Sequence, residues 1–440
     1  MYRQAMEHLK AWKDHDGRKP LIIKGARQVG KTWLMKEFGR GFYQDTVYVN
    51  FDGNDRMQAL FSGDLNPKRI ILGLELYCGH QIDAAHTLLI FDEIQEIPKA
   101  LTSLKYFNEE TPEYQIVCAG SLLGIALHEG TSFPVGKVEF MDLQPMTFIE
   151  FLDAMGKEQY AELLRKHDFE MAAAFRQDYA DLLKQYYLVG GMPEAVQSFA
   201  DRRDCGAVRE IQKRILAAYE QDFSKHAPAD AVPRIRMLWN SIPSQLAREN
   251  RKFIYGLIKE GARAREYEIA LLWLEDCGLV HQVHRVTAPR IPLKAYEDLK
   301  AFKLYLLDVG LLSAMAGLEK EVLLDGSKIF QKFKGALTEQ YVLQQLKAHE
   351  DIQVFYWTAE RAAAEVDFLI QQDSEAIPVE VKAETNLRAK SLKAFHERYQ
   401  PRISIRASMA DYHQEEWLLN IPLWAVNVLP ECIRAEKSRS

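Results

Sequence analysis

One short segment constrains this chain more than any other part of it. Residues 20–24 form an apolar run typical of a buried strand, and residues 33–38 have the composition of a helix start. Between them stand eight residues that fit the pattern G-x-x-x-x-G-K-[ST]: Gly25, Ala26, Arg27, Gln28, Val29, Gly30, Lys31 and Thr32. In such a loop, glycines let successive backbone N–H groups point at one polyphosphate, and the following helix directs its positive dipole end at the same anion. We therefore predict that residues 25–32 bind a nucleoside triphosphate, with Lys31 on the β- and γ-phosphates and Thr32 on Mg²⁺.

A pair of acidic residues lies about sixty positions further along the chain. Four apolar residues, 88–91, lead directly into Asp92 and Glu93. This pattern is typical of a buried parallel strand that carries acids at its C-terminal end, where open α/β sheets bind ligands. We expect Asp92 to hold Mg²⁺, directly or through water, and Glu93 to polarise the attacking water. Two acids are needed because one stays on the metal while the other faces the nucleophile.

The composition is ordinary and excludes several classes of protein. Hydrophobic residues make up 48% and charged residues 27% of the 440 residues, as in a globular protein of about two to four domains. The formal net charge of −6 gives no global positive field, so nucleic-acid binding would require a local patch. The five cysteines are scattered without a C-x-x-C pair, which favours a reducing compartment and argues against a zinc site. No apolar run approaches the ~18 residues of a membrane span, so we expect a cytoplasmic protein without a membrane partner.

Residues 1–155 alternate between strand-like and helix-like runs, which predicts the ATPase core. The strand-like runs after the first one lie at residues 47–51, 86–91, 115–121 and 138–143. Such alternation predicts an α/β fold with a mostly parallel sheet covered on both faces. Residues 156–231 lack strand signals and are rich in Leu, Ala, Glu and Lys, so we expect a helical lid there.

Residues 232–322 combine a helical pattern with a strand pattern. Residues 265–277 carry apolar side chains at helical spacing, Gly278 is suited to end that helix, and residues 279–286 alternate as in a strand. This order is typical of a winged helix-turn-helix, which makes DNA a possible partner. Residues 246–265 contain six basic and two acidic side chains. Such a patch fits a solvated face or a domain contact equally well.

Residues 323–440 are again mixed α/β and contain a second group of acidic residues. Strand-like runs at 364–370 and 377–383, joined by a polar turn, predict a hairpin. The hairpin carries Asp367 on one strand and Glu380 and Lys382 on one face of the next, while a helical run upstream carries Glu339. These acids could converge on a second Mg²⁺ or Mn²⁺, with Lys382 orienting water against a phosphodiester.

The spacing of these residues resembles that of the PD-(D/E)XK nuclease superfamily. Asp367, Glu380 and Lys382 match its hairpin motif, and Glu339 stands at its helical acid position. The resemblance implies an α/β nuclease-like domain over residues 323–440. The same residues also fit an edge strand with a salt bridge, so the fold could be present without the activity.

Several short motifs together resemble those of a bacterial and archaeal family that joins an AAA-type ATPase domain to a C-terminal segment known as DUF4143. They lie at residues 24–32, 91–95, 119–121, 133–138, 190–194 and 261–265, so the resemblance covers nearly the whole chain. The resemblance implies a P-loop core of AAA type. It also implies that Ser121 is a sensor at the end of the fourth strand, in contact with the γ-phosphate or the water. Ser121 fits an ordinary turn after a strand as well.

One departure from ring-forming AAA enzymes concerns the arginine finger. No arginine occurs between Arg69 and Arg165, and Lys137 is the only Lys or Arg between Ser121 and Lys157. A lysine ammonium does not replace an arginine guanidinium in stabilising the delocalised negative charge of the transition state. We therefore expect a monomer or a small switch-like oligomer with slow turnover, in which Lys137 is either the substitute or a solvated loop residue.

Two functions remain open at this stage. The first is a Mg²⁺-dependent, ATP-binding ATPase whose Lys31, Glu93 and Ser121 serve catalysis and whose winged-helix and nuclease-like regions act on or near DNA. The alternative is a regulatory nucleotide switch whose C-terminal domains bind a protein partner and cleave nothing. The second acidic group favours the first function, and the absent finger arginine favours the alternative. A small-molecule kinase is disfavoured, because the sequence supplies no acceptor-site signature.

Overall fold

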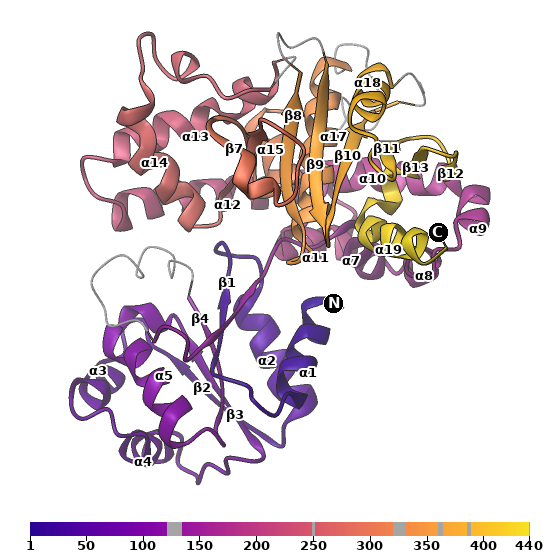
Figure 1. The fold of residues 1–440 in the computed structure, drawn as a ribbon. Helices are drawn as coiled ribbons and strands as arrows, with labels where there is room; N and C mark the ends of the chain where they lie inside the picture. Colours follow the sequence, from indigo (N-terminus) through magenta and orange to yellow (C-terminus); the bar gives the residue numbers. More distant parts are fainter. Residues whose placement is uncertain (121–133, 249–250, 320–330, 360–363, 385–388, 440) are drawn as a thin grey trace. The chain divides into compact units, whose positions relative to one another are not determined.

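The computed structural model describes residues 1–120, 134–248, 251–319, 331–359, 364–384 and 389–439 (Figure 1). These residues form two compact units. The N-terminal unit comprises residues 2–144 with 276–278, and the C-terminal unit comprises residues 145–275 and 279–440 with Met1. The segment expected to be a lid, residues 156–231, therefore belongs to the C-terminal unit.

The N-terminal unit is built on a five-stranded parallel sheet. Its strands are β1 (Leu21–Lys24), β2 (Asp45–Asn50), β3 (Thr87–Asp92), β4 (Gln115–Ala119) and β5 (Glu139–Asp142). They lie in the order β2-β3-β4-β1-β5, and every neighbouring pair is parallel. All residues of β3 and β4 are buried, as expected for central strands of a sheet covered on both faces. The predicted parallel α/β fold is confirmed for this unit.

Helices accompany each strand of this sheet. They are α1 (Ala5–Asp14), α2 (Lys31–Phe42), α3 (Asp55–Ser62), α4 (Pro67–Cys78) and α5 (Pro98–Glu110), with a 3₁₀ turn η1 (Ile94–Glu96) after β3. Helix α2 packs against β2, β3 and β4. Trp12 of α1 contacts Phe38 of α2 edge-on, with ring centroids 6.4 Å apart. The P-loop segment thus enters a helix that is held on both sides by apolar contacts.

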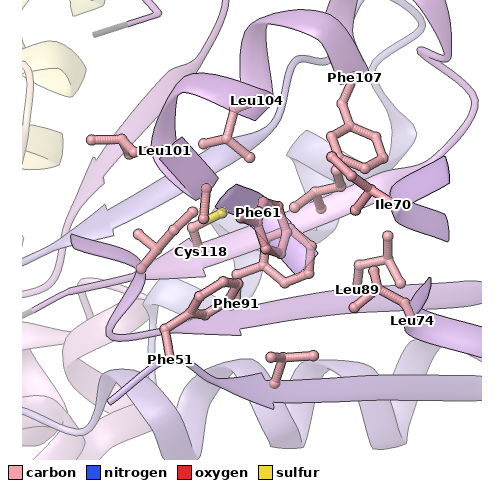
Figure 2. Packing of buried hydrophobic residues seen from close by; sticks show 14 of the residues in the cluster. Phe51, Phe61, Ile70, Leu74, Leu89, Phe91, Leu101, Leu104, Phe107 and Cys118 are labelled. Carbon is pink, nitrogen blue, oxygen red and sulfur yellow. The ribbon is translucent and has the colours of Figure 1, made fainter. Parts of the chain in front are cut away.

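An aromatic cluster on one face of the sheet fixes the end of β3 (Figure 2). The ring of Phe91 lies 5.4 Å from that of Phe51 and 6.4 Å from that of Phe61, both edge to face. Leu104 of α5 packs into the same cluster. Because Phe91 directly precedes Asp92, burial of these rings holds the acidic end of β3 in place.

The first half of the C-terminal unit is helical, as predicted. Its helices are α7 (Phe148–Ala154), α8 (Glu158–Arg165), α9 (Phe169–Ala174), α10 (Arg176–Val189), α11 (Pro193–Arg202), α12 (Cys205–His226), α13 (Val232–Leu246) and α14 (Ala264–Asp276). Thr147 begins α7 with a capping box, in which its side chain accepts from the backbone N–H of Glu150 while the Glu150 carboxylate accepts from Thr147 N–H. No helix among the described residues combines the length and the apolar composition that a membrane span requires.

The second half of this unit contributes a mixed sheet of eight strands. They are β6 (Val280–Val286), β7 (Glu297–Leu306), β8 (Gln353–Thr358), β9 (Glu365–Gln372), β10 (Glu375–Val381), β11 (Ser404–Ser408), β12 (His413–Gln414) and β13 (Leu418–Pro422), in the order β12-β13-β11-β10-β9-β8-β6-β7. The helices of this half are α15 (Val309–Met315), α17 (Gln331–Lys347), α18 (Lys390–Tyr399) and α19 (Leu429–Arg439). The predicted β9–β10 hairpin is present and antiparallel.

The segment expected to be a winged helix shares this sheet. Helix α14 is followed by the antiparallel pair β6–β7, as the helix-glycine-strand pattern predicted. Strand β6 also pairs in parallel with β8, through Arg285 with Tyr356 and Val286 with Trp357. The expected boundary at residue 322 therefore crosses one continuous sheet, and the described structure gives no separate winged-helix domain.

A buried acid organises the centre of the C-terminal unit. Asp308 precedes α15 and is fully buried. Its Oδ2 accepts hydrogen bonds from Gly191 N at 2.6 Å and Gln344 Nε2 at 3.0 Å, and its Oδ1 accepts from Leu311 N at 2.9 Å. A Cβ on Gly190, whose φ is +73°, would lie 2.2 Å from the same carboxylate. Burial raises the pKa of Asp308, and the hydrogen bonds oppose that rise.

Replacing this acid should destabilise the C-terminal unit. In Asp308→Asn one acceptor oxygen becomes a donor facing backbone N–H groups, so we expect the free energy of unfolding to fall by about 1–3 kcal/mol. Urea unfolding followed by circular dichroism would measure it. Asp230→Asn is the matched control, because Asp230 is exposed. Equal midpoints for both variants would contradict the structural role of Asp308.

Candidate functional site

The predicted phosphate loop connects β1 to α2 and takes the backbone conformation that its glycines allow. Gly25 has φ +137° and Gly30 has φ +96°, in regions that other residues rarely adopt. A Cβ on Gly25 would lie 2.4 Å from Leu143 O, so only glycine fits against this backbone. Gln28 also has a positive φ, of +67°. The loop delivers Lys31 and Thr32 at the start of α2.

Lys31 is buried within the loop. Its side chain is 7% exposed, and Nζ donates to Gly25 O at 2.7 Å and Ala26 O at 2.8 Å. Burial lowers the pKa of Lys31 to about 8, while the nearby Glu93 and Asp92 carboxylates act to raise it. An ammonium held in this way can exchange carbonyl oxygens for phosphate oxygens with little rearrangement.

Thr32 and Asp92 meet at the carboxyl end of the sheet, as predicted. Thr32 Oγ1 donates to Asp92 Oδ2 at 2.7 Å. A hydroxyl and a carboxylate are the oxygen ligands that Mg²⁺ prefers. These two side chains therefore fit a magnesium ion, with Thr32 and Asp92 as the residues that would hold it.

The motifs gave no indication of Tyr48, which contacts the same carboxylate. Tyr48 OH donates to Asp92 Oδ2 at 3.0 Å, and Lys36 Nζ lies 3.6 Å from the centre of the Tyr48 ring. Burial and then the Asp92 charge raise the pKa of Tyr48 well above its usual value. The sequence could have indicated Tyr48 only through its place in β2, the strand that pairs with β3, which carries Asp92.

Glu93 stands one residue beyond β3 with φ +52°, which is rare for a residue with a side chain. Gln95 Nε2 donates to Glu93 Oε2 at 2.6 Å. The carboxylate is thus held close to Lys31, whose charge it influences. Asp92 and Glu93 thus lie at one site with different hydrogen-bond partners, and their division of roles stays a prediction.

Arg3 is a second residue that the motifs did not indicate. It is 5% exposed, and its guanidinium donates to Val29 O at 2.9 Å and to Gln144 O at 2.6 Å. It therefore ties the phosphate loop to Gln144, the last residue of the 2–144 segment of the N-terminal unit. No sequence signal marks a lone arginine near a chain start for this role.

Two further expectations concern the segment after β4. Ser121, the expected sensor, lies outside the described residues. Lys137, the expected substitute for an arginine finger, forms an ion pair with Glu109 at 2.9 Å. That hydrogen bond lowers the pKa of Glu109.

The structure places the second acidic group in a network of ion pairs. Glu339 of α17 is buried and pairs with Arg251 through Oε1. Its Oε2 accepts from Tyr305 OH at 3.1 Å and lies 3.8 Å from Lys303 Nζ. Lys303 is fully buried and also pairs with Glu365 at 2.5 Å. Sequence reasoning missed these cations, because Arg251 is 88 residues from Glu339.

Asp367, Glu380 and Lys382 lie on the predicted hairpin but form no metal cage. Asp367 Oδ2 accepts from Val381 N at 2.8 Å, and Lys382 Nζ pairs with Glu380 Oε1 at 2.7 Å. Burial raises the pKa of Glu380, and Lys382 opposes that rise. Across the part of the chain that the structure describes, no three or more His, Cys, Asp or Glu side chains are grouped to hold a metal. The expected second Mg²⁺ or Mn²⁺ is thus not supported, because cationic side chains already neutralise Glu339 and Glu380.

Three segments of the chain match protein-family models. Residues 17–152 match an AAA domain, residues 180–322 match the domain of unknown function DUF8612, and residues 334–426 match the domain of unknown function DUF4143. The predicted AAA domain and the predicted DUF4143 segment are confirmed. These matches do not show a nuclease-like domain. The loop, the strand order and the family match together define the N-terminal unit as a P-loop nucleotide-binding domain of AAA type.

Similar solved structures share little sequence with this chain. The Walker-type ATPase PABY2304 of Pyrococcus abyssi is 14% identical, with 71% of this chain and 95% of that chain covered at a TM-score of 0.43. The Aeropyrum pernix ORC2 protein is 14% identical, with coverage of 74% and 93% and a TM-score of 0.34. The Thermotoga maritima RuvB Holliday junction branch migration motor is 16% identical, with coverage of 67% and 94% and a TM-score of 0.28. A comparison with curated proteins gave no match.

The buried lysine predicts a pH dependence of ATP binding. Below pH 8 Lys31 is charged and ready for phosphate, whereas above its pKa of about 8 it must first gain a proton. ATP affinity should therefore be level from pH 7 to 8 and fall up to about tenfold per pH unit above that. Titration calorimetry from pH 7 to 9.5, with circular dichroism to check folding, would measure this. A level affinity up to pH 9.5 would contradict the perturbed lysine.

Proposed function

We propose that this protein is a Mg²⁺-dependent ATPase that acts as a nucleotide switch, and that its C-terminal unit binds a protein partner without cleaving nucleic acid. The observation that carries the ATPase part is the contact of 2.7 Å between Thr32 and Asp92, beside a buried Lys31 and an acid at position 93. The AAA domain match over residues 17–152 supports it.

Each residue of this site has a defined task in the proposed reaction. The loop backbone and Lys31 bind the β- and γ-phosphates. Thr32 and Asp92 hold Mg²⁺, which when bound supplies positive charge to the phosphate oxygens. Tyr48 keeps Asp92 oriented through its hydrogen bond. Glu93 accepts a proton from the attacking water, and Ser121 is the proposed sensor of the γ-phosphate.

Slow turnover fits the charges around the site. The sequence between Arg69 and Arg165 contains no arginine, and Lys137 is engaged by Glu109. An arginine finger contributes a large part of the rate in related phosphoryl transfers. A chain without one in this region suits a switch, whose two states persist, better than a motor.

The charge balance of the C-terminal unit supports a role without cleavage. Arg251 and Lys303 neutralise Glu339, and Lys382 neutralises Glu380. A nuclease of the expected type would need these carboxylates for metal ions. The fold of a nuclease-like hairpin can serve as a binding scaffold once its acids are paired.

Helix α14 supports a protein partner over DNA. It exposes two large apolar side chains three residues apart, with Ile269 64% and Leu272 51% exposed. Glu266 and Glu268 are exposed on the same helix and would repel phosphates. One of the six basic residues counted nearby, Arg251, is already paired with Glu339.

Steady-state hydrolysis tests the ATPase. Wild type should hydrolyse ATP with Mg²⁺, and Lys31→Ala should lose nucleotide binding because the phosphate charge is left uncompensated. Glu93→Gln should bind ATP normally but lose about 10²- to 10⁴-fold in kcat, since the general base is gone. Glu110→Gln, an exposed acid of α5, is the matched control. Hydrolysis by Glu93→Gln at the wild-type rate would refute the assignment of the base.

Incubation with DNA tests the C-terminal unit. Linear, single-stranded and branched DNA should remain intact with Mg²⁺ or Mn²⁺, with or without ATP, for both wild type and Asp367→Ala. The reason is that Glu339 and Glu380 are paired with cationic side chains and Asp367 accepts a hydrogen bond from the backbone N–H of Val381. Cleavage by wild type that disappears in Asp367→Ala would overturn the proposal in favour of an ATPase-linked nuclease.

A further inference from the structure

A pocket of about 200 Å³ lies in the C-terminal unit, where the β9–β10 hairpin turns. The start of β10, the end of α18, the segment before β11 and the loop after β6 surround it. The pocket is at the opposite end of β10 from Glu380, so it is distinct from the second acidic group. Its apolar walls are formed by Pro289, Ile291, Ala376, Phe395, Tyr399 and Pro401.

The inner wall of this pocket belongs to a hydrophobic core cluster. Phe395 is 1% exposed, and its ring centroid lies 4.9 Å from that of Tyr399 and 5.1 Å from that of Trp357. Ala376 packs against the same cluster. Because packing already fixes these side chains, a ligand would not have to order them. Pockets for whole small molecules usually measure ~300–1,000 Å³, so this one suits a single large side chain.

One side of the pocket is a fixed ion pair. Arg402 Nε donates to Glu375 Oε1 at 2.9 Å, and Arg402 Nη2 donates to Glu375 Oε2 at 2.9 Å. Two donors facing two acceptors orient the plane of the guanidinium. The remaining nitrogen, Nη1, has no hydrogen-bond acceptor among the residues that the structure describes. It can donate to a carbonyl or carboxylate oxygen of a bound peptide.

Two further arginines stand at the rim of the pocket. Arg290 is exposed and lies between the lining residues Pro289 and Ile291. Arg398 is exposed as well, and its guanidinium carbon lies 5.2 Å from the centre of the Tyr399 ring. Within the described part of the chain, neither arginine forms an ion pair with a carboxylate. Both therefore present positive charge to solvent beside the apolar walls.

The acidic residues around the pocket are already neutralised. Those at or within two residues of a lining residue each have a cationic partner, in the pairs Glu375–Arg402 at 2.9 Å, Asp373–Lys437 at 3.3 Å and Glu397–Lys393 at 3.8 Å. These pairs cancel, and the charges of Arg290 and Arg398 remain. The pocket is thus complementary to a ligand that carries carboxylates around one apolar group.

We infer that this pocket is the docking site for an acidic segment of a protein partner, which places one large apolar side chain between the walls and its carboxylates beside Arg290 and Arg398. The inference rests on the proposed function, since it names where the C-terminal unit binds its partner. An anchor side chain in a pocket supplies most of the binding energy at such a site, and the charges around it set orientation and association rate.

A nucleic-acid strand fits the same surface less well. Binding to a phosphate backbone uses a series of cations that follow the strand. Here the Glu375 carboxylate lies in the pocket itself, and Arg402 is engaged by it. Arg290 and Arg398 alone do not form such a series.

Peptide selection on the full-length protein tests the inference. The probe is a phage library of short degenerate peptides, and fluorescence polarisation then measures the affinity of the enriched peptides. We expect these peptides to carry a large apolar residue flanked by Asp and Glu. Ala376→Leu should fill the pocket and Ile291→Ser should remove part of its wall, so each should weaken binding by about tenfold or more. Circular dichroism would show that both variants are folded.

Charge-reversal variants test the role of the rim. Arg290→Glu and Arg398→Glu should each weaken binding of the same peptide by about three- to tenfold, and by less at high salt, because exposed charges are screened. Arg202→Glu is the matched control, since Arg202 is an exposed arginine of α11 away from the pocket.

The outcomes separate this inference from the proposed function. Enrichment of no acidic peptide with an apolar residue, or equal binding to wild type, Ala376→Leu and Ile291→Ser, would refute the pocket as the docking site. If binding is lost only in Leu272→Ser of α14, a protein partner stands and the pocket assignment fails. Displacement of the peptide by single-stranded DNA that requires Arg290 and Arg398 would overturn the choice of a protein partner. ATP hydrolysis is measured separately, so its failure would refute the ATPase alone.

Discussion

The hydrogen bond of 2.7 Å between Thr32 and Asp92 is the contact on which the rest of the N-terminal site depends. Thr32 follows β1 and Asp92 ends β3, and β4 lies between these two strands in the sheet. The side chains can meet only if all three strands are in register. Buried apolar residues secure that register, because slipping a strand by one residue would exchange side chains of different size within a close-packed interior. The position of the polar site at the carboxyl ends of the strands therefore follows from the apolar packing of the sheet.

The two acidic groups of this chain are compensated in different ways, which separates their functions. At the end of β3, the side chains that donate hydrogen bonds to Asp92 are the uncharged hydroxyls of Thr32 and Tyr48, and the Lys31 ammonium nearby forms its own hydrogen bonds with Gly25 O and Ala26 O. In the C-terminal unit, Glu339 and Glu380 already have cationic partners. A buried carboxylate is stabilised by hydrogen bonds, as at Asp308, or by a positive group. Where the protein supplies that group itself, little is left for a divalent ion to gain.

Most of the fold and the centre of the nucleotide site could be predicted, because their signals are local in sequence. The loop of residues 25–32 and the strand before Asp92 each combine a pattern with its chemistry in one short segment. The residues that complete the sites come from elsewhere. Arg3, Tyr48, Arg251 and Lys303 act through contacts between distant segments, and spacing alone cannot indicate such contacts. The expected metal site in the C-terminal unit is not supported for the same reason, since the acids were visible in the sequence and their cationic partners were not.

Arg3 joins the phosphate loop to the residue at which the chain leaves the 2–144 segment of the N-terminal unit. Its guanidinium joins Val29 O in the phosphate loop to Gln144 O, and the chain leaves the N-terminal unit at that residue. Both bonds are short and the guanidinium is 5% exposed, so water cannot readily replace either acceptor. Within the N-terminal unit, Arg3 therefore joins the backbone of the phosphate loop directly to the backbone of Gln144.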